Sequence, residues 1–309
     1  MAIPVFSRAH VEAAVSPERA LDAVRAAFVA YARGEWTMPP KVFVPAYPAG
    51  DFRAMPALGA GHALLKWVTS FPGNPPQGLP TVTGVVLLSD ASNGMLKAAL
   101  DAGAVTALRT GAAAVLAAET LGRDGPAGVI GAGVNGRAVA RTFVARGRPV
   151  LIHDVSAERA EAVADELGAQ AVARDEALDA PVLATVTPGR NVVLAEGALG
   201  RGQHASLMGA DGPGKGEIAI EELARVRVFC DDWEQASHNG DLAHAVEAGV
   251  VVRADVTQLG DVLDGTAQGR HDDDEITVFD STGLAIQVLA IALAAFAQAG
   301  ELDLSTLAL

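Results

Sequence analysis

The sequence predicts an α/β protein, in which a parallel sheet covered by helices is joined to a second region with mostly antiparallel strands. Half of the 309 residues are hydrophobic and 19% are charged, a composition that excludes intrinsic disorder. Residues 36–101 contain short apolar runs separated by prolines and glycines, which is typical of antiparallel strands. From residue 127 onward, short apolar runs alternate with segments of helix length, which is typical of a parallel sheet.

The first marked element is a helix that begins at Pro17. Ser16 is suited to the N-cap, proline is favoured at the first helical position, and Gly34 follows Arg33 as a stop signal. Beyond Trp36, the apolar runs between prolines predict a set of antiparallel strands. These expected strands are Leu64–Thr69, Val82–Leu88 and Met95–Leu100.

A long helix over residues 104–121 follows, and its small residues recur at helical spacing, which predicts close packing. The expected strands of the parallel sheet are Ala127–Ile130, Val150–His153, Val182–Val186, His204–Met208, Val226–Cys230 and Thr277–Asp280. We therefore expect two domains, one of residues 1–118 with 284–309 and one of residues 119–283. The apolar helix after Gly283 is expected to fold back onto the first domain.

Charge and cysteine content exclude several classes of protein. The net charge is −14, from 23 Lys and Arg against 37 Asp and Glu, which argues against nucleic-acid and anionic-membrane binding. The only cysteine, Cys230, excludes an internal disulfide, and a buried strand thiol is favoured over a nucleophile. The seven histidines show no metal-ligand spacing, so no metal site is expected. No signal segment or spanning helix is recognised, which predicts a cytoplasmic protein.

The strand at 127–130 leads directly into a Gly-x-Gly-x-x-Gly turn, residues 131–136, and then into a helix. Such a turn brings a pyrophosphate close to the backbone and to the free N–H groups of the helix. Asp154 closes the next strand, where an acid binds the ribose hydroxyls and disfavours a 2′-phosphate. These features predict a Rossmann domain that binds NAD, and NADP is the alternative because Arg159 is close.

Further cofactor contacts are expected where two later strands end. Thr185 and Thr187 could donate to the cofactor or simply cap a strand that ends at Pro188. Met208 and Gly209 end the following strand. The cofactor contacts predicted from these strand ends and the turn are Gly131, Gly133, Val134, Asn135, Asp154, Thr185, Thr187, Met208 and Gly209.

Lysine is scarce, and Lys66 lies between large apolar residues in an expected strand. A charge among apolar neighbours is costly unless it is paired, so Lys66, Arg53 and Arg109 are candidates for ligand binding. A structural ion pair is the alternative for each. Asp211 lies in a Gly/Pro loop after the strand at 204–208, where a catalytic acid or base, or an ordinary turn residue, is expected.

Eight short segments, in order along nearly the whole chain, resemble the ornithine cyclodeaminase/μ-crystallin family. The likeness to its archaeal-type alanine dehydrogenase branch rests on the loop at 209–215 and on residues 231–236 and 280–287. The segments are Met38–Lys41, Arg53–Pro56, Leu65–Val68, Pro72–Asn74, Gly78–Val82, Leu108–Gly111, Gly209–Lys215 and Phe279–Gly283.

The resemblance implies a dimer formed through the strand-rich domain, which also binds the substrate. It implies that Lys41, Arg53, Lys66 and Arg109 hold the substrate carboxylate, with Thr282 beside the substrate. It places Asp211 at the catalytic acid/base position, and we expect Lys66 to take part in catalysis. The cofactor-contacting positions implied by the resemblance are Thr81, Arg109, Gly133, Asn135, Asp154, Lys215 and Ser281.

One departure from the family pattern favours a dehydrogenase. The cyclodeaminases carry an acidic residue near the position that aligns with Arg53, where it helps to hold a diamino substrate. Four cations and Asp211 give the expected pocket a formal charge of 4 − 1 = +3. An unmatched second ammonium at about 4 Å from a cation would cost about 4 kcal/mol, roughly a thousandfold in binding.

We therefore expect an NAD-dependent amino-acid dehydrogenase, an alanine dehydrogenase, that interconverts L-alanine with pyruvate and ammonia. The alternatives are an ornithine or lysine cyclodeaminase that recycles its NAD, a ketimine reductase, and a μ-crystallin-like protein that binds NAD(P)H without catalysis. The expected partners are a small amino acid or 2-oxo acid and a second copy of the chain, with no nucleic acid and no membrane.

Overall fold

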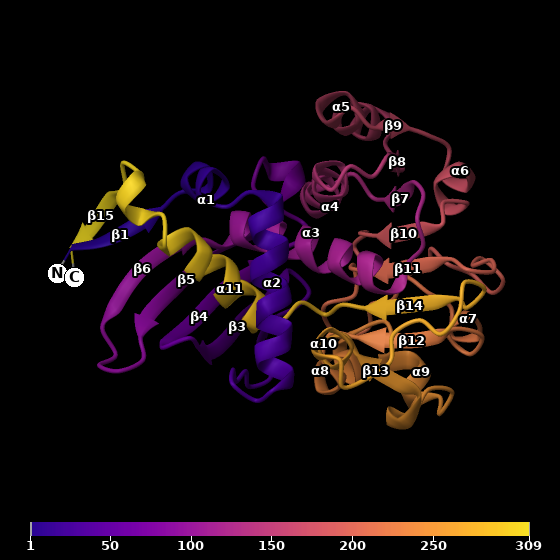
Figure 1. The fold of residues 1–309 in the computed structure, drawn as a ribbon. Helices are drawn as coiled ribbons and strands as arrows, with labels where there is room; N and C mark the ends of the chain where they lie inside the picture. Colours follow the sequence, from indigo (N-terminus) through magenta and orange to yellow (C-terminus); the bar gives the residue numbers. More distant parts are fainter. Residues whose placement is uncertain (1, 309) are drawn as a thin grey trace. The chain divides into compact units, whose positions relative to one another are not determined.

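The structure, a computed structural model, describes residues 2–308, which form two compact units (Figure 1). Unit 1 comprises Met1–Arg109 with Leu284–Leu309, and unit 2 comprises Thr110–Gly283. The first division falls inside one continuous helix, α3 (Ala102–Leu121), and the boundary expected at residue 118 lies in the same helix.

Unit 1 is built on a seven-stranded mixed sheet. Neighbouring strands are antiparallel except for β1 and β6, which run parallel. In sheet order the strands are β15 (Ser305–Ala308), β1 (Ala2–Phe6), β6 (Leu96–Asp101), β5 (Val82–Asp90), β4 (His62–Ser70), β3 (Gly50–Gly59) and β2 (Val42–Ala46).

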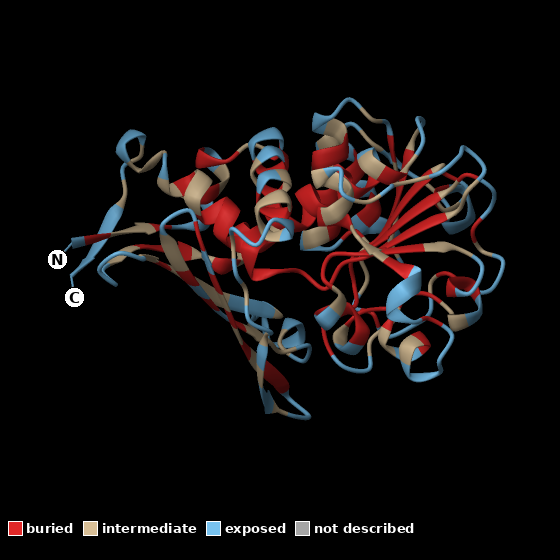
Figure 2. Ribbon diagram, turned by 60° about the horizontal axis from the view of Figure 1, so that its bottom comes forward, coloured by how far each residue is buried: buried red, intermediate tan, exposed pale blue. Residues whose placement is uncertain are grey.

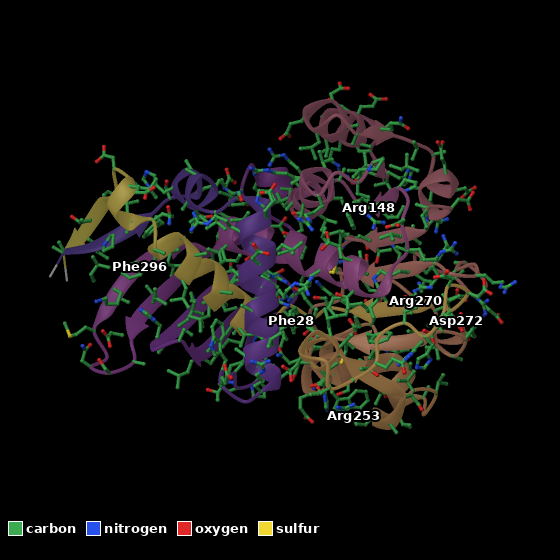
Figure 3. All side chains as sticks on the ribbon, in the orientation of Figure 1. Phe28, Arg148, Arg253, Arg270, Asp272 and Phe296 are labelled. Atoms are coloured by element: carbon green, nitrogen blue, oxygen red, sulfur yellow. The ribbon has the colours of Figure 1, made fainter. Side chains whose placement is uncertain are left out.

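Helices α1 (Arg8–Ala14), α2 (Pro17–Ala32) and α11 (Ala285–Phe296) belong to the same unit. The Ser16 hydroxyl accepts a hydrogen bond from the Arg19 N–H, as expected of an N-cap, and Gly34 has a φ of +71°. Helix α11 packs against α2 and against β3, β4 and β5. Phe28 of α2, labelled in Figure 3, is fully buried. Two short 3-10 helices, η1 (Pro75–Gln77) and η3 (Ala299–Glu301), complete the unit.

Unit 2 contains an eight-stranded sheet in which every pair of neighbouring strands is parallel. Figure 2 shows its central strands as buried, which matches their apolar sequences. In sheet order the strands are β13 (Val256–Gln258), β12 (Arg227–Cys230), β14 (Thr277–Asp280), β11 (His204–Leu207), β10 (Val182–Thr185), β7 (Ala127–Ile130), β8 (Val150–His153) and β9 (Gln170–Ala171).

The helices of unit 2 connect these parallel strands. Helix α3 packs closely against one of these helices, α4, which contains Ala138. A Cβ added to Gly111 would lie 2.7 Å from the Ala138 carbonyl oxygen, so the small face of α3 is required by this contact. The connecting helices are α4 (Val134–Ala145), α5 (Ala157–Leu167), α6 (Arg174–Leu178), α7 (Ile220–Leu223), α8 (Trp233–Asn239), α9 (Ala243–Glu247), η2 (Arg253–Asp255) and α10 (Leu259–Asp264).

Helix α3 is long and apolar enough to cross a membrane by length and composition alone. However, 83% of its apolar stretch is buried inside the fold. This burial is the property of a core helix, and no other helix among residues 2–308 passes the same test.

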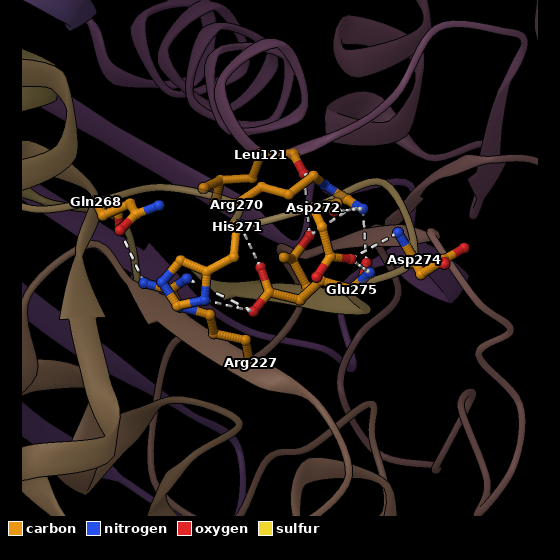
Figure 4. A network of polar contacts seen from close by, with 9 residues as sticks. Leu121, Arg227, Gln268, Arg270, His271, Asp272, Asp274 and Glu275 are labelled. Atoms are coloured by element: carbon orange, nitrogen blue, oxygen red, sulfur yellow. Dashed lines mark hydrogen bonds and ion pairs between the residues drawn. The ribbon is translucent and has the colours of Figure 1, made fainter.

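Arginines occupy the amino-terminal edge of the parallel sheet (Figure 4). Arg270 donates to the carbonyl oxygens of Leu121, Glu275 and Gly202 at 2.6, 2.6 and 3.1 Å. Arg148 donates in the same way to two carbonyl oxygens in the turn before β7. These side chains satisfy backbone acceptors that the strand ends leave open.

The predicted fold class is confirmed, because one sheet is wholly parallel and the other mostly antiparallel. The six strands expected in unit 2 are present, three of them with the expected bounds. Six strands had no bounds predicted from the sequence, namely β1, β2, β3, β9, β13 and β15, although β2 and β3 lie in the region expected to contain antiparallel strands. The buried positions of β3 include Asp51 and Arg53, which remove the apolar alternation that identifies a strand, and Pro56 lies inside it.

Candidate functional site

The strand order of unit 2 places the glycine turn where the connections reverse direction. From β7 the chain continues to β8 and β9 on one side, and then returns to β10 and β11 on the other side. In parallel sheets, ligands bind outside the carboxyl ends of the strands at such a reversal. The turn after β7 and the segment after β10 therefore flank the expected cofactor position.

The three glycines of this turn differ in what surrounds them. Gly131 has a φ of +110°, and a Cβ there would lie 2.6 Å from the Val186 carbonyl oxygen. A Cβ at Gly136 would collide with the Gly131 carbonyl oxygen. A Cβ at Gly133, the N-cap of α4, would meet nothing within 4 Å. At two of the positions, close backbone contacts leave no room for a side chain. The third glycine leaves open space at a helix N-terminus, which fits a pyrophosphate.

Asp154, at the end of β8, is held in place by its neighbours. One oxygen accepts from the Ala132 N–H at 2.7 Å, and the other accepts from the Ser156 N–H and from Arg159. Burial alone would raise the pKa of Asp154, but these hydrogen bonds outweigh burial and the pKa is lowered. The carboxylate is therefore ionised, as an acceptor for ribose hydroxyls must be.

The hydroxyl groups of Thr185 and Thr187 donate to the carboxylate of Glu217. Thr185 is also fully buried, so its hydroxyl group is enclosed within unit 2. Glu217 accepts two further hydrogen bonds, from the backbone N–H groups of Thr187 and Gly209, both at 2.8 Å. Both hydroxyls therefore bind a carboxylate 30 to 32 residues later in the chain, and Thr187 Oγ1 also accepts from the Gly189 N–H at 3.2 Å.

Gly209 also begins the loop that carries Asp211. Asp211 and Lys215 form an ion pair with an Oδ1–Nζ distance of 2.5 Å, and both are partly exposed. Met208, just before this loop, and Gly209, its first residue, are buried. The loop therefore places one partly exposed acid after β11, at the same edge of the sheet as the glycine turn.

A second carboxylate, Asp231, organises the segment after β14. It accepts hydrogen bonds from the hydroxyls of Ser281 and Thr282, each at 3.2 Å, and from the Gly283 N–H at 2.8 Å. Ser281 and Thr282 are 2% and 1% exposed within the structure. Their hydroxyls are therefore oriented by Asp231.

Two more buried carboxyls, Asp241 and Asp280, lie between Glu217 and Asp231. The Glu217 N–H donates to Asp241, and the Leu242 N–H donates to Asp280 at 3.1 Å. Burial first, and then Glu217, raises the pKa of Asp241 to about 7. Burial, Asp241 and Asp231 raise the pKa of Asp280 well above its ordinary value. The carboxyl edge of the sheet thus carries a continuous buried group of acids.

In unit 1, the cationic residues of β3 and β4 share one face of the sheet. Arg53 pairs with Val68 and Met55 pairs with Lys66 in the antiparallel register, so their side chains point the same way. All four are at most 7% exposed. The opposite face of the same strands carries Trp67 and other exposed apolar side chains.

These cations have specific partners. Arg53 Nε donates to Asp51 Oδ1 at 2.6 Å, and its guanidinium lies 5.2 Å from the centre of the Phe43 ring. Lys66 Nζ donates to Thr106 Oγ1 of α3 at 2.7 Å. Arg109 follows Thr106 by three residues, so it extends from the same side of α3 and is 8% exposed.

The structure corrects the charge count made from the sequence. That count contained four cations and Asp211, and it left out Asp51, which is buried beside Arg53. With Asp51 included, the four cations and two acids give a formal charge of 4 − 2 = +2. Lys41 and Thr81, which precede β2 and β5, are partly buried residues of the same unit.

Sequence reasoning missed Asp51, Glu217 and Asp231 as members of the site. Each acts through partners that are close only in the folded chain, apart from Asp51, which lies two residues before Arg53. An alternating strand pattern with two charges on its buried face would have identified Asp51 and Arg53 together. No comparable local pattern marks Glu217.

Among residues 2–308, no group of histidines, cysteines and acids is arranged to hold a metal ion. Cys230 is fully buried in β12, and burial, followed by the nearby Asp231 and Asp280, raises the pKa of its thiol well above the ordinary value. A buried, protonated thiol is unsuited to nucleophilic attack.

Comparison with known proteins places this geometry in a family. Alanine dehydrogenase of Archaeoglobus fulgidus is 40% identical over 298 residues, which cover 93% of this chain and 92% of that protein. The solved structure of an archaeal alanine dehydrogenase dimer with bound NAD superposes with a TM-score of 0.94 at 38% identity, covering 100% of this chain and 99% of that one.

A second solved structure, Δ1-pyrroline-2-carboxylate reductase of Thermococcus litoralis in complex with NADH and L-proline, has a TM-score of 0.92 at 27% identity. It covers 99% of this chain and all of that one. The model of the ornithine cyclodeaminase/mu-crystallin family matches residues 3–301. The chain, with its glycine turn, its buried cations and its acid-bearing loop, belongs to the ornithine cyclodeaminase/mu-crystallin family.

Proposed function

We propose that this protein is an NAD-dependent amino-acid dehydrogenase that oxidises L-alanine to pyruvate and ammonia and catalyses the reverse reaction. The observation that carries the proposal is the group of buried cations Arg53, Lys66 and Arg109 in unit 1, in which Arg53 pairs with Asp51. This group suits a substrate with one carboxylate and no distal ammonium. The similarity to alanine dehydrogenase supports the same substrate class.

The residues of unit 2 fit NAD. The open space at Gly133 and the N-terminus of α4 suit the pyrophosphate, and Asp154 suits the adenosine ribose hydroxyls. The Asp154 carboxylate would also repel the 2′-phosphate of NADP, although Arg159 partly offsets its charge. We propose Asn135, Lys215, Ser281 and Thr81 as further cofactor contacts.

The bound nicotinamide supplies a hydride acceptor for the substrate Cα–H. Arg109, Arg53, Lys66 and Lys41 bind the substrate carboxylate and so fix the direction of the Cα–H bond. Thr282 lies beside the substrate. Asp211 takes a proton from the substrate ammonium and releases it to solvent. It then takes a proton from the water that adds to the substrate iminium and returns it to the nitrogen. As the C–N bond breaks, the carbinolamine hydroxyl proton goes to the released ammonia, which leaves as ammonium. Lys66 stabilises the negative charge of the substrate during this exchange.

A homodimer formed through unit 1 is part of the proposal. The face of β2–β5 opposite to the cations is apolar and exposed: Val42, Val44, Leu65 and Trp67 are 56%, 45%, 38% and 38% exposed. Large exposed apolar faces of this kind mark protein interfaces. The related archaeal structure is a dimer. The cytoplasmic location expected from the sequence stays a prediction.

The test is a spectrophotometric screen with NAD⁺ and NADH over L-alanine, ornithine, lysine, cyclic ketimines and 2-oxo acids with ammonium. A dehydrogenase forms NADH with L-alanine, whereas a cyclodeaminase releases ammonia from ornithine or lysine without net NADH. Consumption of NADH with a cyclic ketimine, and none with pyruvate and ammonium, would make the protein a reductase. Tight NADH binding without any turnover would indicate a binding protein.

The variant that tests the proposed acid/base is Asp211→Asn. Removal of the acid/base is expected to lower kcat at least about 100-fold, while the Kd for NADH changes less than about twofold. Unchanged turnover in this variant would remove Asp211 from the mechanism.

A further inference from the structure

Both carboxylate oxygens of Glu217, a buried acid of unit 2, accept two hydrogen bonds each. Oε1 accepts from the backbone N–H and the hydroxyl of Thr187 at 2.8 and 2.6 Å. Oε2 accepts from the Thr185 hydroxyl and the Gly209 N–H, both at 2.8 Å. The side chain is fully buried, so these four hydrogen bonds replace water entirely.

These bonds join three parts of the carboxyl edge. Thr185 and Thr187 belong to the end of β10, and Gly209 begins the loop after β11. Glu217 itself ends that loop, so its carboxylate connects the two ends of the segment that carries Asp211. A Cβ on Gly209 would lie 2.5 Å from the Glu217 carboxyl carbon, which shows how closely the two ends meet.

The main chain at Glu217 is equally fixed. Its carbonyl oxygen accepts from the N–H groups of Val193 and Leu194 at 2.6 and 2.9 Å, and its N–H donates to Asp241. The preceding residue, Gly216, donates to the Gly189 carbonyl oxygen at 2.8 Å. The base of the loop is therefore rigid, whereas Asp211, within the loop, is partly exposed.

We propose that Glu217 is a positioning residue that sets the location of Asp211 by closing the loop from Gly209 to Glu217 onto the end of β10. This inference rests on the proposed role of Asp211 as the acid/base. Glu217 is buried and acts through the loop, and it needs no contact with substrate or cofactor.

The role requires a carboxylate and no other group. The Thr187 and Gly209 N–H groups are fixed backbone donors, and they face different oxygens of Glu217. An amide has one acceptor oxygen, so glutamine in either orientation would direct its NH2 group at one of these donors. One hydrogen bond would be replaced by a donor–donor contact, and that end of the loop would be displaced.

Burial raises the pKa of Glu217, and the hydrogen bonds from Thr187, Thr185 and Gly209 act in the opposite direction. Because fixed backbone donors face both oxygens, the ionised form is the one that the geometry accommodates. Burial, and then the charge of Glu217, raises the pKa of the neighbouring Asp241 to about 7.

The experiment is a double-mutant cycle with Glu217→Gln and Asp211→Asn, using the full chain with NAD⁺ and the substrate identified by the screen. Glu217→Gln is expected to lower kcat about 10- to 100-fold, with the Kd for NADH within about threefold of the parent. In the Asp211→Asn background the same substitution is expected to change kcat less than about twofold, because it acts through Asp211.

Glu222→Gln is the matched control. Glu222 is also fully buried in unit 2, and it accepts from the backbone N–H groups of Gly197 and Leu199 at 2.7 and 2.8 Å, away from the Asp211 loop. This variant is expected to lose thermal stability comparably and to keep kcat within about twofold. If Glu217→Gln does not fold, Thr185→Val, which removes one of the four hydrogen bonds, is expected to lower kcat about threefold in the Asp211 background only.

The outcomes separate this inference from the proposed function. Full activity in Asp211→Asn would overturn the role of Asp211. If Asp211→Asn is inactive as expected, two results would overturn the role of Glu217: normal kcat in Glu217→Gln, or an equal loss of kcat in both backgrounds.

Discussion

The two edges of the parallel sheet in unit 2 satisfy their backbone groups with opposite chemistry. At the amino edge, Arg270 and Arg148 donate to carbonyl oxygens that precede the strands (Figures 3 and 4). At the carboxyl edge, Glu217 and Asp231 accept from the N–H groups of Gly209 and Gly283, which follow β11 and β14. Both sets are buried or partly buried, and both replace solvent.

The two edges differ in whether their charged groups can change protonation near neutral pH, and in whether groups of the same kind lie close together. Guanidinium groups stay charged at any physiological pH, so the amino edge is a constant structural connection. Carboxyl groups near one another share protons, so the carboxyl edge can change its charge with pH and with a bound ligand. The ligand edge is therefore the adjustable edge, and substitutions should affect stability at one edge and function at the other.

Arg270→Met tests the structural edge and should have the largest effect on stability. The substitution leaves carbonyl oxygens of Leu121, Gly202 and Glu275 without their charged donor, so the free energy of unfolding should fall by about 3 kcal/mol. Urea denaturation measures this. The Kd for NADH should change less than about twofold. A loss below about 1 kcal/mol would show that the arginines are not the main connection at this edge.

Asp241→Asn tests the adjustable edge. The pKa of Asp241 is raised to about 7, so the folded state holds its proton where the unfolded chain has lost it. The stability from this group is complete below about pH 4 and is lost as the pH rises through about 7. Asparagine stays neutral, so the variant should gain about 1 to 3 kcal/mol relative to the parent between pH 5 and pH 8.

Thermal unfolding of parent and variant at several pH values measures this difference. Asp165→Asn, which replaces an exposed acid of α5, is the control and should give a curve parallel to that of the parent. Parallel curves for Asp241→Asn as well would contradict the proton-sharing interpretation of the carboxyl edge.

Arg201→Ala should have the smallest effect on the free energy of unfolding. It tests whether an exposed arginine at the amino edge contributes as much stability as a buried one. Arg201 pairs with Asp274 close to Arg270, but their side chains are 78% and 62% exposed. Exposed pairs are screened by solvent, so the free energy of unfolding should change by less than about 0.5 kcal/mol, and less still in high salt. A change above about 1 kcal/mol would mean that exposed pairs also hold this edge.

The features that depend on a few adjacent residues could be predicted from the sequence. The glycine turn, Asp154 and the buried apolar strands of unit 2 follow from a few adjacent residues, and the structure places them in the expected order. Strand β3 could not be recognised, because the charged residues Asp51 and Arg53 occupy its buried face. The charged residues of the candidate site therefore obscured the strand that carries them.

Glu217 could not be identified in advance for a different reason. Its four donors come from positions 8 to 32 residues away, and they meet only when β10 and β11 pair. The same holds for Asp231, which accepts from the adjacent Asp232 N–H but also from three donors 50 to 52 residues later in the chain. Residues that position other residues can therefore be recognised from their contacts in the folded structure, but not from their spacing in the sequence.

The buried thiol of Cys230 has a practical consequence. It is the only cysteine in the sequence, and it lies at the end of β12, next to Asp231. A labelling reagent can therefore reach sulfur only when this part of the sheet opens. Under conditions where closing is faster than labelling, the labelling rate gives the free energy of that opening. The chain thus contains its own reporter of local opening at the carboxyl edge.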